Sequence, residues 1–189
     1  MQDRVAADLR ESIAAIEATV DQCLPTVVEA AEAIIHCYEE GGMVLIAGNG
    51  GSAADAQHFV GEMLGWFLDK ARGPLPAIAL TTNTSVLTSI SNDASVDVVF
   101  SRQLEALAAP EDVFIAISTS GESPNILRAV ETARAIGAKT VALCGPPGSK
   151  LAGKADITIA VPAELAPHIQ VAHAAVLHAI CRMVDEREW

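Results

Sequence analysis

Two side chains that could act on a substrate stand four residues apart in a stretch of good helix formers. His58 and Glu62 follow an apolar, strand-like run at residues 44–47 and a glycine- and serine-rich segment at residues 48–52. On a helix this spacing places both side chains on one face, one above the other. An imidazole and a carboxylate in that arrangement could transfer protons or supply two ligands to a metal ion.

A second polar set lies in the apolar C-terminal stretch that begins near residue 167. Gln170 and His178 are eight residues apart, so they share one side of the predicted helix. Polar groups in so apolar a helix are costly unless they are paired. With His58 and Glu62 they could hold a divalent cation; zinc is the usual ion for imidazole plus carboxylate, although a glutamine oxygen makes the set untypical. His173 is interpreted as an interior residue, or as one that supports the ligands, rather than as a ligand itself.

Two loops could bind an anion such as phosphate. Residues 48–52 lead into the helix of His58, and such a loop aims backbone N–H groups and a helix N-terminus at a ligand. Residues 118–123 follow the apolar run 113–117 and contain three serines and a threonine. A serine-rich loop alone is more often a solvated turn. Its place after a buried strand, opposite a second loop of this kind, favours a phosphate site without lysine or arginine.

The elements that must position these loops alternate along the chain. We expect strands near residues 44–47, 77–80, 113–117, 140–143 and 157–161, with helices between them and a final helix from about residue 167. One of these helices is expected to break at residues 91–93. This alternation predicts a single α/β domain with a parallel sheet and helices on both faces. Ligands of such sheets bind outside the carboxyl ends of the strands, where both loops lie.

Before the first strand we expect two helices, at residues 2–23 and 26–40, separated at Cys23-Leu24-Pro25. The first carries an apolar stripe at three- and four-residue spacing, formed by Val5, Leu9, Ile13, Ile16 and Val20. A helix outside the α/β core has nothing of its own to pack on for its whole length. We therefore expect it to pack partly against a second copy of the chain; the alternative is a helix that lies only on its own sheet.

Composition narrows the classes of function. The formal net charge of −12 over 189 residues disfavours nucleic acid or an anionic membrane as a partner. No signal peptide and no membrane-spanning run is visible, so a cytoplasmic location is expected. The four cysteines lack a C-x-x-C pair and lie in apolar or helical contexts, which favours buried free thiols in a reducing compartment.

A dinucleotide-binding fold is the obvious competitor, because residues 48–53 formally match G-x-G-x-x-A. Two observations weigh against it. A ribose-binding acid is expected at the end of the next strand, where the sequence has Thr81-Thr82. The serine-rich loop 118–123 would also have no role.

The motifs together resemble those of the phosphoheptose isomerases, members of the sugar isomerase (SIS) domain superfamily. The resemblance covers nearly the whole chain. It is carried by GNGGSAADAQH at residues 48–58, ALTT at 79–82, ND at 92–93, SRQ at 101–103, ISTSGESPN at 117–125 and IQ at 169–170.

This resemblance implies a single SIS domain over residues 1–189, a flavodoxin-like three-layer α/β sandwich in which residues 1–40 form a helical extension used in oligomer packing. It further implies a homotetramer with active sites between subunits. The implied activity is the interconversion of sedoheptulose 7-phosphate and D-glycero-D-manno-heptose 7-phosphate, the first step toward the heptose of lipopolysaccharide or related glycans.

The resemblance also assigns roles to residues by their matching positions. The phosphate-binding positions are Ser52, Ser118, Thr119, Ser120 and Ser123. The remaining substrate positions are Asn49, Gly50, Gly51, Asp93 and Gln170. The family's zinc ligands, for one ion per subunit, match His58, Glu62, Gln170 and His178.

The reaction requires a base that takes a proton from one carbon and returns it to the next through an enediol(ate). We expect Glu62 to be that base and His178 to shuttle a proton or polarise the carbonyl, with zinc stabilising the enediolate as a Lewis acid. A carboxylate held tightly by zinc is a poorer base. Either the metal mainly orders the site, or Glu62 leaves it during turnover.

The sequence departs from the family's pattern at three places. Trp66 stands where many members have arginine, Val171 replaces a glutamate, and Ala94-Ser95 replaces a glycine-aromatic pair. These changes bear on the choice of sugar more than on the reaction class. The rival hypothesis is a non-catalytic SIS-domain protein that senses sugar phosphates or assists the replication initiator. The presence of both Glu62 and His178 favours the enzyme.

Overall fold

The computed structural model describes all residues, 1–189, and contains one five-stranded sheet. Its strands are β1 (Val44–Gly48), β2 (Ala77–Ala79), β3 (Val113–Ser118), β4 (Lys139–Cys144) and β5 (Ile157–Ala160). They pair in the order β2-β1-β3-β4-β5, and every pair is parallel. This is the flavodoxin-like order, in which the chain reverses its direction of winding between β1 and β3. The predicted α/β fold is confirmed.

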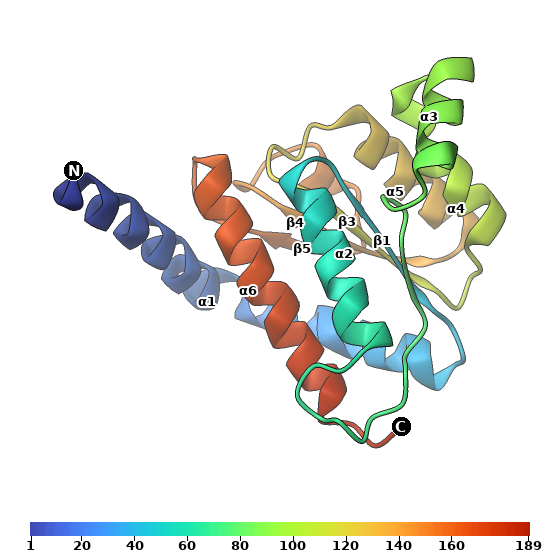
Figure 1. Ribbon diagram of the computed structural model, residues 1–189, viewed down its shortest axis with the longest axis horizontal. Helices are drawn as coiled ribbons and strands as arrows, with labels where there is room; N and C mark the ends of the chain where they lie inside the picture. Colours follow the sequence, from blue (N-terminus) through green and yellow to red (C-terminus); the bar gives the residue numbers. More distant parts are fainter.

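Helices cover both faces of the sheet (Figure 1). One face carries α1 (Gln2–Glu39), α2 (Gly51–Leu64) and α6 (Ala166–Asp185), which pack on Val44, Ile46 and their neighbours. The other carries α3 (Thr84–Asp93), α4 (Ser101–Leu107) and α5 (Pro124–Ile136), which pack around Leu45 and Phe114. All residues of β1 and β3 are buried, as expected for the central strands of a parallel sheet.

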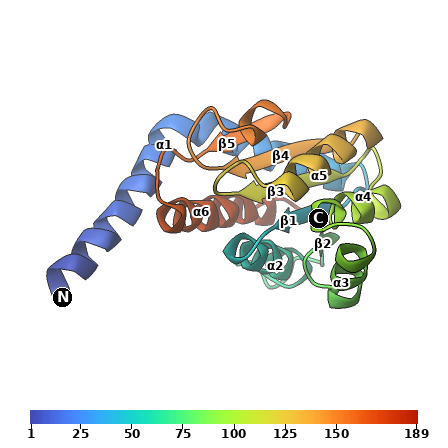
Figure 2. The same ribbon diagram turned by 90° about the horizontal axis from the view of Figure 1, so that it is seen from above.

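The N-terminal region is a single helix, so the prediction of two helices separated at Cys23-Leu24-Pro25 was wrong. Proline lacks one N–H and kinks a helix, but the helix continues when the turns on both sides are held. Cys23 and Val27 are buried in the core, and the Thr26 hydroxyl donates to the Cys23 carbonyl. The proline therefore bends α1 without ending it, and Figure 2 shows the change of direction.

The prediction that residues 91–93 break a helix was also wrong, because α3 runs to Asp93. The Ser91 hydroxyl donates to the Leu87 carbonyl at 2.7 Å, a bond that a helix interior accommodates. The five strands and the start of the final helix lie close to their predicted bounds. Gly137 adopts φ of 101° just after α5, a left-handed conformation typical of a glycine that ends a helix.

The four cysteines, Cys23, Cys37, Cys144 and Cys181, are all free and buried, as predicted. Burial raises the pKa of Cys37 to about 11 and that of Cys181 to about 12. None of the helices has the length and apolarity needed to span a membrane.

Candidate active site

The two glycine- and serine-rich loops lie side by side at the carboxyl edge of the sheet. They follow the adjacent strands β1 and β3, in which Gly48 is paired with Ile117. Loop 48–52 leads directly into α2, and loop 118–123 leads into α5. Both lie at the topological switch point, where ligands of such sheets bind.

Glycine is required in loop 48–52 by close contacts and by backbone conformation. A Cβ on Gly48 would lie 2.6 Å from the Ser52 carbonyl oxygen, and Gly50 has φ of +55°. Neither α2 nor α5 has a side-chain N-cap hydrogen bond or an acidic residue in its first turn. The N-termini of both helices therefore remain suited to an anionic ligand.

The hydroxyl groups of loop 118–123 form a connected cluster. Ser118 Oγ lies 3.0 Å from Ser123 Oγ and 3.4 Å from Ser120 Oγ. Ser118 Oγ also accepts a hydrogen bond from the Gly121 N–H at 3.1 Å. Thr119 is half-buried, and Ser52 is buried in the first turn of α2. The structure therefore brings the predicted phosphate-binding residues to one edge of the sheet.

A third loop, residues 145–150, supports the second and was missed by sequence reasoning. A Cβ on Gly145 would lie 2.1 Å from the Thr119 carbonyl oxygen, so the two loops are in close contact. The Lys150 ammonium lies 2.6 Å from the Glu122 carboxylate, and the Leu151 N–H donates to the Gly121 carbonyl. The glycine and proline residues at 145–148 were the available signal, but they are also typical of ordinary turns.

Three of the four predicted metal ligands converge at the surface between α2 and α6, two helices that pack side by side (Figure 1). Ligand atoms of His58, Glu62 and His178 all lie within 4.8 Å of one another. The Nε2 atoms of the two histidines are 2.7 Å apart, and His58 Nε2 is 3.4 Å from Glu62 Oε1. Two imidazole nitrogens and a carboxylate oxygen at this spacing fit the donor preference of zinc.

Gln170, the fourth predicted ligand, belongs to α6 and contacts α2 at Asp55, about one turn before His58. Its Nε2 donates to Asp55 Oδ2 at 3.4 Å and leaves no room for a Cβ on Gly51. Burial raises the pKa of the Asp55 carboxyl, against the opposing effects of Gln170 and His58. Sequence reasoning missed Asp55. Its position three residues before His58 was the signal that could have found it.

Asp93 and the three departures from the family pattern take no part in the hydrogen bonds described for the two loops and the histidine-glutamate group. Asp93 is exposed and accepts a hydrogen bond from Asn92 rather than from the loops. Trp66 is 56% exposed, with the Lys70 ammonium 5.8 Å from its ring. Val171 is exposed, and the Ser95 hydroxyl accepts from the Asp97 N–H.

His173 is fully buried, so the prediction of an interior residue is confirmed. Its Nε2 lies 3.0 Å from the Cys144 carbonyl oxygen, to which the neutral ring donates. Burial lowers the pKa of His173 to about 4, against the effect of that hydrogen bond.

The chain is similar in sequence to known proteins. A family model described as the SIS domain matches residues 9–145. The probable phosphoheptose isomerase of Thermoplasma acidophilum is 51% identical over 161 residues, which are 85% of this chain and 88% of that protein. The phosphoheptose isomerase of Trichlorobacter lovleyi is 43% identical over 186 residues, or 98% and 94% of the two chains.

Solved structures give the same result. The phosphoheptose isomerase of Neisseria gonorrhoeae matches with a TM-score of 0.93 and 42% identity, covering 98% of this chain and 99% of that one. The fold and the loops at its switch point are thus those of a SIS domain. Within this class, the chain belongs to the phosphoheptose isomerase family.

Proposed function

We propose that this protein is an aldose-ketose isomerase that converts sedoheptulose 7-phosphate to D-glycero-D-manno-heptose 7-phosphate. The observation that carries the proposal is the group His58, Glu62 and His178 beside two phosphate-type loops, with α2 contributing to both. Family membership and the names of the relatives support the same substrate. We place the reaction at the start of heptose synthesis for lipopolysaccharide or a related glycan, in the cytoplasm, where four free thiols would stay reduced.

The substrate's phosphate would be held by hydroxyls and helix N-termini instead of cations. The donors are Ser52, Ser118, Thr119, Ser120 and Ser123, with backbone groups of Gly50 and Gly51. Asn49, Asp93 and Gln170 would contact the sugar. Fixing the phosphate at the start of α2 directs the sugar along this helix toward Glu62, which follows more than two turns later.

Proton transfer would then be divided between two side chains. While its carboxylate is free of the metal, Glu62 takes a proton from C1 of the ketose and returns it to C2, so that the substrate passes through an enediolate. His178 moves the proton of the C1 hydroxyl to the oxygen on C2, so the aldose forms without loss or gain of atoms.

We further propose one zinc ion per subunit, held by His58, Glu62, Gln170 and His178. The donor set supports this assignment. Two imidazoles and a carboxylate face one another at an exposed surface, and a cation between them would give their nitrogen and oxygen atoms a common partner. When bound, zinc supplies positive charge that polarises the carbonyl and stabilises the enediolate.

A second copy of the chain would complete the site. Val5, Leu9 and Ile13 are each more than half exposed, and an apolar groove between α1 and α6 continues this stripe. His58 and His178 are exposed, although an enediolate needs protection from water. We therefore propose a homotetramer in which residues 1–40 pack between subunits and the active sites lie at the interfaces.

The test is turnover of sedoheptulose 7-phosphate by the purified protein, with and without zinc, followed as formation of the aldose. Glu62→Gln and His178→Ala are each expected to lower kcat roughly 100-fold or more. The controls are Glu39→Gln and His36→Ala, which alter an exposed histidine-glutamate pair on α1. Metal analysis of the same preparation tests the zinc site separately.

One outcome would overturn the proposal, and a binding measurement would then choose the alternative. Absence of turnover by the wild-type protein under every metal condition would rule out the isomerase. If the protein nevertheless bound the sugar phosphate, the non-catalytic regulator would become the better assignment.

A further inference from the structure

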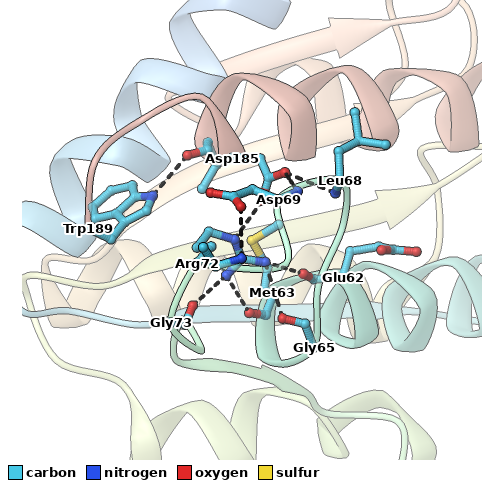
Figure 3. Close-up of polar contacts among 11 residues, drawn as sticks. Glu62, Met63, Gly65, Leu68, Asp69, Arg72, Gly73, Asp185 and Trp189 are labelled. Carbon is cyan, nitrogen blue, oxygen red and sulfur yellow. Dashed lines mark hydrogen bonds and ion pairs between the residues drawn. The ribbon is translucent and has the colours of Figure 1, made fainter.

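A buried ion pair, Arg72 with Asp185, lies between the C-terminal ends of α2 and α6, next to the backbone of Glu62 (Figure 3). Arg72 Nε is 2.7 Å from Asp185 Oδ1, and the two side chains are only 1% and 4% exposed. The mechanism does not use either residue. A buried ion pair is weak evidence for stability, because desolvation offsets its attraction, so its directional contacts are more informative.

The remaining N–H groups of Arg72 all face backbone carbonyls. Nη1 donates to Met63 and Gly73 at 2.9 Å each, and Nη2 donates to Glu62 at 2.6 Å, with Gly65 at 3.5 Å. Two of these carbonyls belong to the last turn of α2, whose carbonyls have no partner within the helix. Arg72 therefore holds the peptide group of Glu62 itself and places a cation at the C-terminal end of the helix.

Asp185 connects α6 to the segment that follows α2. Its Oδ2 accepts from the Leu68 and Asp69 N–H groups at 2.9 and 2.7 Å. Burial alone would raise the pKa of Asp185. The two N–H groups and the guanidinium nevertheless hold this pKa below its ordinary value. The carboxylate therefore stays charged and pairs with Arg72.

The same segment contacts the candidate site through Phe67. Its ring lies 5.7 Å from the imidazole of His178, at an interplanar angle of 30°. The next residue along the chain is Leu68, which Asp185 holds. The ion pair is thus linked to the backbone of Glu62 on one side and to the ring of His178 on the other.

We propose that Arg72 and Asp185 are positioning residues that set the separation of α2 and α6, so that Glu62 and His178 meet at metal-binding distance. The expected effect on catalysis rests on the proposed function. The expected effect on the positions of Glu62 and His178 does not, because it can be measured in the protein without substrate. A merely structural pair would lower stability when altered and leave the relation between the two helices unchanged.

The experiment compares Arg72→Lys and Asp185→Asn with the wild-type protein. Lysine keeps the charge but cannot reach Asp185 and four carbonyls at once, and asparagine keeps the shape of the carboxylate. The matched control is Asp112→Asn, because Asp112 is also buried and accepts two backbone N–H groups, from Met43 and Ala109, at the amino edge of the sheet.

Three measurements are made below the unfolding temperature. Titration with cobalt(II), followed by its absorption spectrum, is expected to show roughly 10-fold or greater loss of affinity in both variants. With sedoheptulose 7-phosphate, kcat should fall by a similar factor while KM changes little, because the phosphate loops are untouched. Proton-nitrogen correlation spectra of the metal-free protein should show shifted ring signals for His58 and His178, with His36 unchanged.

Asp112→Asn is expected to lower the thermal midpoint without changing any of the three readouts. If one variant fails to fold, the other carries the test. Unchanged ring signals and unchanged cobalt(II) affinity in a folded variant would overturn the proposal. Absence of turnover by the wild-type protein would refute the isomerase instead, since ring signals and metal titration do not depend on it.

Discussion

The side chains of Asn49 and Asn125 exchange two hydrogen bonds of 2.9 Å each, although 76 residues separate them in the chain. Asn49 belongs to the loop after β1, and Asn125 lies in the first turn of α5. This amide pair ties together the two loops that we expect to hold the phosphate.

Changing Asn125 to aspartate tests that connection. The substitution keeps the size of the side chain, removes the amide group that donates to Asn49, and adds a negative charge beside the two loops. KM for sedoheptulose 7-phosphate is expected to rise roughly 10-fold or more, with a smaller effect on kcat, in steady-state kinetics. Asn83→Asp is the control, because this N-cap of α3 tolerates aspartate equally well. An equal rise in both variants would contradict the role of the pair.

A methyl group at position 51 should displace Gln170. A Cβ on Gly51 would lie 1.9 Å from Gln170 Nε2, the free end of a flexible side chain, so the helix can remain intact while the amide moves. We expect Gly51→Ala to keep its thermal midpoint and to lose zinc affinity and kcat, measured by competition with a chelating dye and by turnover. Gly61→Ala, in the same helix, meets no atom within 4 Å and should retain both. Wild-type zinc affinity in Gly51→Ala would argue against Gln170 as a ligand.

His173 should make stability depend on pH. Its pKa is lowered from 6.5 to about 4 in the folded protein, so the unfolded chain binds a proton that the folded chain excludes. The stability contributed by the neutral ring is present above pH 6.5 and is lost as the pH falls toward 4, by up to about 3 kcal/mol. Urea unfolding at a series of pH values should show this slope.

Comparing His173→Gln with the wild-type protein shows whether His173 causes this dependence of the free energy of unfolding on pH. Glutamine can still donate to the Cys144 carbonyl but does not titrate, so the difference in free energy of unfolding between the two proteins should narrow on acidification. His36→Gln, at an exposed position, should leave the slope unchanged. If the stability of His173→Gln depends on pH as strongly as that of the wild-type protein, other groups cause the dependence.

The exposed stripe on α1 should control assembly. Leu9 and Ile13 are 58% and 54% exposed, and Leu9→Glu with Ile13→Glu would place two charges in the proposed interface. Sedimentation velocity is expected to show smaller species than for the wild-type protein. Leu107→Glu, at a 44% exposed leucine on α4, is the control. An unchanged sedimentation coefficient in the double variant would remove α1 from the interface.

Local spacing was enough to predict the α/β fold and to single out His58, Glu62 and the two loops. His58 and Glu62 lie four residues apart on one helix, and each loop follows a strand directly, so neighbouring residues in the sequence carry the information. Arg72 could not be found in this way. In a segment rich in glycine and proline it is indistinguishable from a solvated charge, and its partner Asp185 lies 113 residues away.

The continuity of α1 escaped prediction for a related reason. Pro25 is a strong local signal for a helix boundary, but the burial of Cys23 and Val27 on either side depends on the assembled core. The partnership of Asn49 with Asn125 likewise exists only after β1 and β3 pair.

That pairing of Gly48 with Ile117 also joins ligand binding to folding. Each loop alone would supply half of the proposed phosphate site, and the two halves would form one site only when two strands from distant parts of the chain are hydrogen-bonded. A sugar phosphate that contacts both loops binds the folded chain and not the unfolded one, so by mass action every tenfold excess over its Kd adds about 1.4 kcal/mol to the free energy of unfolding. An unreactive phosphosugar would thus protect the protein from heat and proteolysis as well as a substrate does.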